Sequence, residues 1–547
     1  MAKRLKKVLP SIVSESQAAF VQGRLISDNI LVAHELLHAL NSSNACSEEF
    51  IAIKTDISKA YDRVEWSFLE NALRILGFDG KWIHLVMGCV KIVNYQVLIN
   101  GKPYGDIKST QGLRQGDPLS PYLFVICTEM LVRMMKKAEQ DGKITGLQIA
   151  RKAPPVSHLL FADDSMFYCK GSEAELNQIG RIIEEYSLAS GQRVNYQKSS
   201  VCFGKKIPIS RREEIKRKLG IEKEGGEGNY LGLPENFGKS KVETMKYLQE
   251  RMKQRTTGWH SKFLSTGGKE VLRKSVAMAL PTYTMMCFKL PKTTYDQITS
   301  ALAEFWWRSN SKGNGMHWKT WKALCKPKEE GGLDFRDLEA YNLALLGKQM
   351  WRMMTRKDTL MARIFRGKYF PKSDPLQASL GSNPSYAWSS INAAQNLLKQ
   401  GTRYVIGRGN HTRAWKDNWI DTKPARPPLV RQQVPDQYHH LLHDNTKVEE
   451  LLVNNGREWN TEIVQNLFSR EDGEIIERIR PGGGFTEDSF SWDFSRNGEY
   501  TVKSAYWLQI QIQNRSCSSQ EVLNPSLNPL FQMLWKTEGS PKVQHFL

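Results

Sequence analysis

A pair of aspartates between two apolar segments is the feature of this sequence that most constrains its fold. The segment VSHLL precedes the turn around Ala162, Asp163 and Asp164, and SMFYC follows it. Asp is typical of tight turns, and short apolar runs bounded by turn residues are typical of paired strands. The sequence therefore predicts a hairpin over residues 156–169 with two carboxylates at its tip.

A third carboxylate follows another apolar run. Residues 50–57 (FIAIKTDI) predict a buried strand that ends at Asp56. A strand-end carboxylate near a paired carboxylate is costly unless the charges are neutralised. Two Mg²⁺ ions would neutralise them, because hard cations prefer oxygen ligands. Each segment alone also has an ordinary structural explanation, a turn in one case and a strand end in the other.

The charge of the chain favours a polyanionic partner. Its 547 residues include 77 Lys and Arg against 57 Asp and Glu, a formal net charge of +20. Nucleic acid is the first candidate partner, and simple solubility is the alternative. The eight Cys form no CxxC pair, and no apolar run approaches ~20 residues. We therefore expect reduced thiols, no membrane segment, and an intracellular protein of the nucleus or cytoplasm that is not secreted.

Helical patterns alternate with these strands, so the predicted fold class is α+β. Asp62 fits an N-cap with Glu65 three residues on, and this structural explanation is favoured over a catalytic one. The predicted helices are residues 28–40, capped by Asp28; the segment from Asp62 to Gly77; and residues 120–137, capped by Ser120 with Pro121 in the first turn.

Five segments in order carry a family resemblance. They are DISKAYDRVEW, QGLRQGDPLSPYLFVI, FADDS, ASGQRVNYQKS and YLGLP. This succession resembles motifs A to E of reverse transcriptases from plant LINE-type (non-LTR) retrotransposons. The resemblance covers residues 1–300 well and the Trp-rich remainder more loosely. It implies a right-hand polymerase with an α+β palm, partial fingers, a helical thumb and a Trp-rich C-terminal extension.

The resemblance assigns the catalytic and metal-binding residues. Asp56, Asp163 and Asp164 match the carboxylates that hold two Mg²⁺ ions, with Mn²⁺ as an alternative, and Ile57 would add a backbone carbonyl. Such a pair of ions activates the primer 3′-hydroxyl and stabilises the leaving pyrophosphate. The implied reaction transfers a nucleotide from a dNTP to a primer on an RNA template.

The resemblance also implies residues that contact the nucleotide and the primer. Tyr61 matches an aromatic steric gate, and a core aromatic is the equal alternative. Lys198 matches a residue near the triphosphate that can act as a general acid, although a solvated surface Lys is slightly favoured. Gln115 and Gly116 match the nucleotide pocket, and Tyr230, Leu231 and Gly232 match the primer grip.

We expect four regions along the chain, with pieces missing at both ends. An inactive remnant of an element and a non-catalytic, maturase-like RNA-binding protein are the alternatives to a polymerase. The sequence leaves the oligomeric state open. The expected regions are 1–204 (partial fingers and palm), 205–300 (end of the palm and helical thumb), 301–489 (Trp-rich connection) and 490–547 (truncated start of a reverse-transcriptase zinc-binding-like region).

Overall fold

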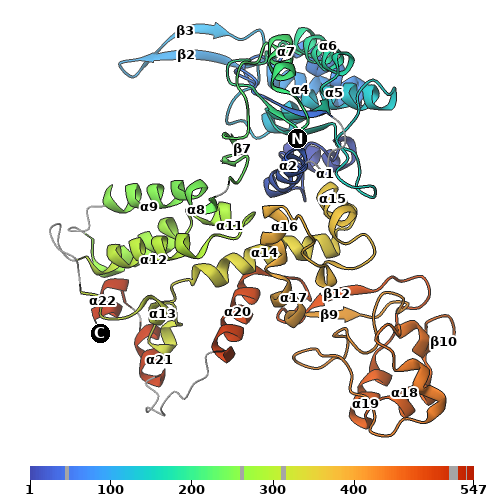
Figure 1. The fold of residues 1–547 in the computed structure, drawn as a ribbon. Coiled ribbons are helices and arrows are strands. Elements are labelled where there is room, and N and C mark those ends of the chain that lie inside the picture. Colours follow the sequence, from blue (N-terminus) through green and yellow to red (C-terminus); the bar gives the residue numbers. More distant parts are fainter. Residues whose placement is uncertain are drawn as a thin grey trace. The chain divides into compact units, whose positions relative to one another are not determined.

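The computed structural model divides the chain into two compact units, which are described separately (Figure 1). It describes residues 1–42, 49–238, 240–258, 264–308, 316–516, 528–537 and 539–546. The first unit comprises residues 1–237, 358–372 and 381–387, and the second comprises 238–357, 373–380 and 388–547. Within the described residues, every helix is too short or too polar to cross a bilayer.

A four-stranded antiparallel sheet organises the first unit. Its strand order is β4-β5-β1-β6. The predicted hairpin is confirmed, because Phe161 of β4 pairs with Asp164 of β5. The predicted buried strand is also confirmed, since most residues of β1 are buried, and β1 lies between β5 and β6. The strands are β1 (Phe50–Thr55), β4 (His158–Phe161), β5 (Asp164–Lys170) and β6 (Ser200–Phe203).

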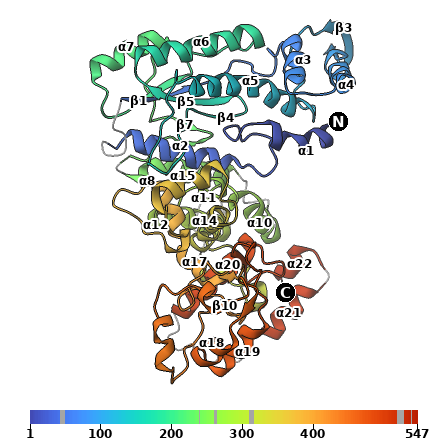
Figure 2. The same ribbon diagram turned by 90° about the vertical axis from the view of Figure 1, so that its right-hand side faces the viewer.

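Helices cover the two faces of this sheet. In Figure 2, α5 and α6 lie on one side of the strands and α2 on the other. Side chains alternate along a strand, so Ile51 and Ile53 join the core beneath α5 and α6, whereas Lys54 faces the opposite side. The helices of this unit are α1 (Ala2–Ile12), α2 (Ile26–Leu40), α3 (Trp66–Ile75), α4 (Gly80–Lys91), α5 (Ser120–Gln140), α6 (Glu173–Ser190), α7 (Ile209–Leu219) and α15 (Leu360–Tyr369).

Three predicted helix caps are wrong, although the helices themselves are confirmed. Helix α2 begins after Leu25, and Asp28 is its third residue, where the Asp28 carboxylate accepts a hydrogen bond from the Leu25 backbone. Helix α3 begins after Glu65, so Asp62 lies in the preceding turn. Ser120 is the first residue of α5 rather than its cap. Helix α2 thus extends past its predicted cap, α5 includes its predicted cap, and α3 begins four residues after its predicted cap. Burial of the apolar face, rather than the polar residue, decides where each helix begins.

Two further hairpins belong to the first unit. Strands β2 (Asn94–Ile99) and β3 (Lys102–Lys108) form an exposed two-stranded ribbon, and β7 (Asn229–Tyr230) and β8 (Leu233–Pro234) form a short one. The turn of the short hairpin contains Leu231 and Gly232, both with positive φ. Two successive residues of positive φ are typical of the tight hairpin turn that matches strand twist.

His158 of β4 makes the stability of the first unit depend on pH. The ring is 4% exposed and lies 2.9 Å from Ser16 Oγ and 2.8 Å from Ser157 Oγ. Burial, and to a lesser extent the charge of Lys136, lowers the pKa of His158 from 6.5 to about 3. The unfolded chain therefore binds this proton more readily, and stability falls as the pH drops below 6.5 towards about 3.

We expect His158 alone to cost about 2 kcal/mol between neutral pH and about pH 5. The measurement is urea unfolding at both pH values, with hydrogen exchange at β4 as the readout. His158→Gln should flatten this pH dependence. An unchanged dependence in the variant would contradict the assignment.

The second unit is mostly helical, with two small antiparallel pairs of strands. The pairs are β9 (Thr402–Val405) with β12 (Ser489–Trp492), and β10 (Leu452–Val453) with β11 (Glu458–Trp459). The helices are α8 (Lys241–Thr244), α9 (Lys246–Gly258), α10 (Thr266–Leu272), α11 (Thr282–Met285), α12 (Lys292–Trp307), α13 (Trp321–Leu324), α14 (Leu338–Thr355), α17 (Gln395–Gly401), α18 (Thr461–Leu467), α19 (Arg470–Arg478), α20 (Val502–Ser516), α21 (Asn528–Lys536) and α22 (Pro541–Phe546).

Arg273 is an unusual core residue of the second unit. It is 0% exposed, and its guanidinium carbon lies 3.9 Å from the Trp321 ring centroid and 3.8 Å from that of Phe335. Within the described residues, its guanidinium nitrogens have no hydrogen-bond partner. Ring stacking offsets only part of the cost of burying this charge.

We therefore expect Arg273→Met to stabilise the second unit by roughly 2 kcal/mol. Thermal unfolding measures this change, with Arg356→Met as the control.

Candidate active site

The three predicted carboxylates lie at one edge of the four-stranded sheet. Thr55 of β1 pairs with Ser165 of β5, so Asp56, the next residue, emerges beside Asp164. Asp163 lies in the two-residue turn between β4 and β5, together with Ala162, which has positive φ. Asp163 is exposed, whereas Asp56 and Asp164 are half-buried. The antiparallel pairing of β1 with β5 thus brings residues more than one hundred positions apart into one site.

The electrostatics of Asp164 show that these charges act on one another. Burial raises the pKa of Asp164, and the neighbouring charges of Asp163 and then Asp56 raise it further. Lys54 opposes them by lowering the same pKa. The arrangement therefore concentrates negative charge that favours a bound cation.

The chemistry of these donors fits a divalent cation, but the side chains are not assembled around one. Within the described residues, no group of three His, Cys, Asp or Glu side chains is placed to hold a metal ion. Carboxylate oxygens are nevertheless the ligands that Mg²⁺ prefers, and their mutual repulsion is what such an ion relieves.

Tyr61 lies next to the carboxylates and packs on helix α5. Its ring stacks on Phe124 with centroids 4.9 Å apart and planes 12° apart. Burial raises the pKa of Tyr61, and the charge of Asp163 raises it further. Tyr61 is half-buried: its ring packs in the core, and its hydroxyl is close enough to the carboxylates to interact with the charge of Asp163. Both explanations considered from the sequence, a core aromatic and a site residue, thus describe part of its surroundings.

The loop before α5 carries the next two predicted residues. Gln115 is exposed, and its amide nitrogen lies 3.4 Å from Asp62 Oδ1. Gly116 has φ +89°, a conformation that a side chain rarely adopts, and a Cβ there would meet no atom within 4 Å. Backbone conformation rather than crowding therefore favours glycine at this position.

Lys198 follows a loop that is anchored to the end of β1. The Asn195 backbone donates a 2.7 Å hydrogen bond to the carbonyl oxygen of Asp56. Lys198 itself is exposed. In the described part of the chain, neither Lys198 nor Gln115 makes a hydrogen bond or ion pair with the three carboxylates. The structure therefore groups Asp56, Asp163, Asp164 and Tyr61, and leaves Lys198 and Gln115 outside that group.

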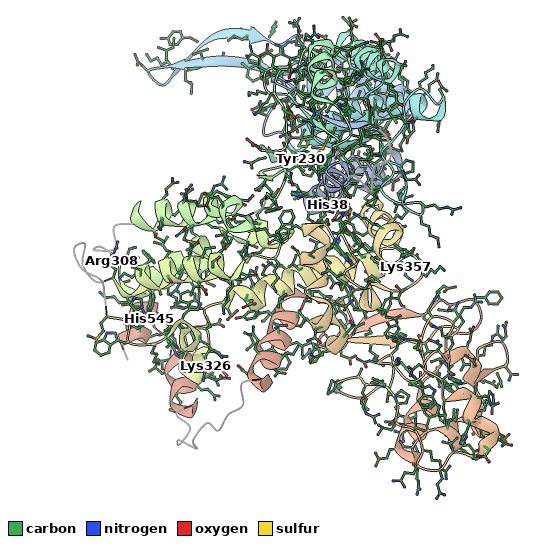
Figure 3. All side chains as sticks on the ribbon, viewed as in Figure 1. His38, Tyr230, Arg308, Lys326, Lys357 and His545 are labelled. Atoms are coloured by element: carbon green, nitrogen blue, oxygen red, sulfur yellow. The ribbon has the colours of Figure 1, made fainter. Side chains whose placement is uncertain are left out.

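A buried ion pair, missed by the sequence analysis, ties the β7–β8 hairpin to β1. Lys54 Nζ lies 2.9 Å from Glu235 Oε1 and also donates to the carbonyl oxygen of Asn229. Glu235 is 1% exposed and accepts a second hydrogen bond, 2.9 Å long, from the Gly226 backbone. Figure 3 labels Tyr230 on this hairpin, where it is 1% exposed. Strand alternation is the signal that could have found Lys54, because it shares a face with Asp56.

Comparison with known proteins identifies the family. Residues 1–248 match the family model described as reverse transcriptase (RNA-dependent DNA polymerase). An uncharacterized mitochondrial protein of Arabidopsis thaliana is 46% identical over 153 residues, which are 28% of this chain and 99% of that protein. Residues 1–248 belong to the reverse transcriptase family. The resemblance seen in the sequence is thereby confirmed.

Other relatives are matched over only part of their length. A retrovirus-related Pol polyprotein from the type-1 retrotransposable element R2 of Popillia japonica is 27% identical over 24% of this chain and 20% of that protein. The chain spans about half the length of some other curated relatives. The solved structure of apo telomerase from Candida tropicalis is 14% identical over 66% of this chain and 60% of that one, with a TM-score of 0.32, which is too low to support further comparison.

Proposed function

We propose that this reverse transcriptase is an RNA-directed DNA polymerase that transfers nucleotides from dNTPs to the 3′-hydroxyl of a primer. One observation supports the proposal most directly. Within a reverse transcriptase domain, β1 and the β4–β5 turn bring Asp56, Asp163 and Asp164 together at one sheet edge. The negative charges of the three carboxylates repel one another, and two bound metal ions would neutralise them, as in a two-metal polymerase site.

Asp56, Asp163 and Asp164 would hold two Mg²⁺ ions, with a backbone carbonyl from Ile57. When bound, such ions lower the pKa of an attacking hydroxyl and stabilise negative charge on phosphate oxygens. The residues of the chain would mainly position the reactants. Tyr61, held against Phe124, would lie beneath the sugar of the dNTP and exclude a ribose 2′-hydroxyl.

The remaining roles belong to the surrounding loops. Gln115 and Gly116 would shape the nucleotide pocket, and Lys198 would approach the triphosphate once the dNTP is bound. The β7–β8 turn, with Tyr230, Leu231 and Gly232, would hold the primer. We also propose a division into four regions with an RNA template, a DNA primer and dNTP as partners. The regions are fingers and palm (1–204), end of the palm and helical thumb (205–300), Trp-rich connection (301–489) and start of a reverse-transcriptase zinc-binding-like region (490–547).

Primer extension on an RNA template tests this proposal. The full chain, an annealed RNA–DNA primer–template, dNTPs and Mg²⁺ should give extended primers, and removal of Mg²⁺ with a chelator should abolish extension. The steric gate adds a specific readout, because Tyr61→Ala should admit ribonucleotides while Tyr95→Ala, a change on the exposed ribbon, should not.

The alternative functions are outcomes of the same experiment. Tight filter binding of RNA without any extension, with Mg²⁺ or Mn²⁺, would favour a maturase-like binding protein. Neither binding nor extension by folded protein would favour an inactive remnant of an element. Either result would overturn the proposed polymerase activity.

A further inference from the structure

A groove on the face of the four-stranded sheet that α5 and α6 cover lies apart from the carboxylates. It has a volume of about 1020 Å³ and runs between α6, α7 and the loop after α6. Ile53 and Thr55 of β1 lie at its base. Lys54 and Asp56 alternate with them and therefore face the other side of the sheet. The groove is thus separated from the proposed active site by the thickness of the sheet.

Cationic side chains predominate around this groove. Arg63, Arg181, Arg193 and Lys218 line it, against Glu65 and Glu184. Arg181 and Arg193 are exposed, so their guanidinium groups are accessible to a ligand. Lys218 is paired with Glu173, 2.5 Å away, which leaves the arginines as the main source of positive charge.

Two buried polar atoms of the lining residues lack partners. Gln192 is 2% exposed, and its Nε2 donates to the Ala60 carbonyl oxygen at 2.8 Å, but its Oε1 has no hydrogen-bond partner among the described residues. The Nε of Arg63 is likewise buried without one. Such atoms are costly unless a ligand or water satisfies them. They point to a ligand with both donors and acceptors.

We propose that this groove binds a single-stranded segment of RNA. Guanidinium groups bind phosphates in a planar, bidentate geometry. Tyr196, also in the lining, is 52% exposed and offers a ring on which a base can stack. The exposed side-chain amide of Asn177 can both donate to and accept from a base edge. An acidic peptide would use the arginines but would need neither the ring nor the amide.

This inference rests on the proposed function only for the identity of the polymer. The groove would hold a part of the RNA away from the site of synthesis, so that RNA stays attached while the primer end moves. Binding here requires no metal ion. A binding measurement in the presence of a chelator therefore tests the groove independently of polymerase activity.

The test is fluorescence anisotropy of a labelled single-stranded RNA without a primer, with the full chain and a chelator, over a series of salt concentrations. Tyr196→Ala should weaken binding about tenfold. Arg181→Gln should weaken it and lower the slope of log Kd against log salt by about 0.7, the value for one phosphate contact on a single strand. Arg151→Gln, an exposed arginine outside the groove, is the matched control.

Photocrosslinking of 4-thiouridine-labelled RNA gives a second readout. We expect crosslinked peptides from residues 177–196. Equal binding by Arg181→Gln, Tyr196→Ala and the control, or crosslinks confined to other regions, would overturn the inference. The alternative result is displacement of the RNA by a polyglutamate peptide that binds equally well to the wild-type chain and to Tyr196→Ala. That result would favour an acidic protein partner instead. Groove-dependent RNA binding without primer extension would overturn the proposed function and leave this inference standing.

Discussion

Asp163→Asn is expected to reduce primer extension by at least about 1000-fold, which corresponds to about 4 kcal/mol of lost transition-state stabilisation. The substitution removes one charge at the site where Asp56, Asp163 and Asp164 meet, and with it a ligand for the proposed metal ions. It should leave the fold intact. Asp163 is exposed at a turn, and Asn suits a turn as well as Asp does.

The matched control is Asp141→Asn. Asp141 is exposed at the end of α5 and forms a surface ion pair of 3.2 Å with Lys143, so its loss should change extension little. Single-turnover extension at saturating dNTP separates loss of chemistry from loss of binding, and thermal unfolding checks the fold of both variants. Measurable extension by Asp163→Asn at the rate of the control would mean that the proposed mechanism is wrong.

Much of the palm could be predicted from the sequence because its signals are local. The apolar runs on either side of Ala162 to Asp164 predicted the hairpin, and the β-branched run before Asp56 predicted a buried strand. The grouping of Asp56 with the hairpin carboxylates required the family resemblance, because it depends on the pairing of β1 with β5. A pairing over such a separation leaves no periodic pattern in the sequence.

The errors also have physical causes. Asp28, Asp62 and Ser120 are good capping residues, but each helix begins where its buried face begins. The Lys54–Glu235 pair was missed because it joins residues 181 positions apart. Only the folded structure shows that Glu235 is buried and therefore requires a positively charged partner.

Glu235→Ala is expected to destabilise the β7–β8 hairpin by about 3 kcal/mol, because it leaves Lys54 and the Gly226 N–H without their buried acceptor. Since this hairpin carries the proposed primer grip, the KM for the primer should rise more than the kcat falls. Hydrogen exchange at residues 226–235 measures the first effect, and steady-state extension at varied primer concentration measures the second.

Two further variants distinguish the loss of the Lys54–Glu235 ion pair from a general loss of stability. Glu224→Ala removes a more exposed pair with Arg212, 2.9 Å long, and should cost less than about 1 kcal/mol. The double variant Lys54→Met/Glu235→Met replaces both charges and should recover much of the stability lost in Glu235→Ala, since neither group is then left uncompensated. The loss of stability in the double variant could instead equal the sum of the losses in Lys54→Met and Glu235→Met. In that case packing around Tyr230, and not this ion pair, would hold the hairpin.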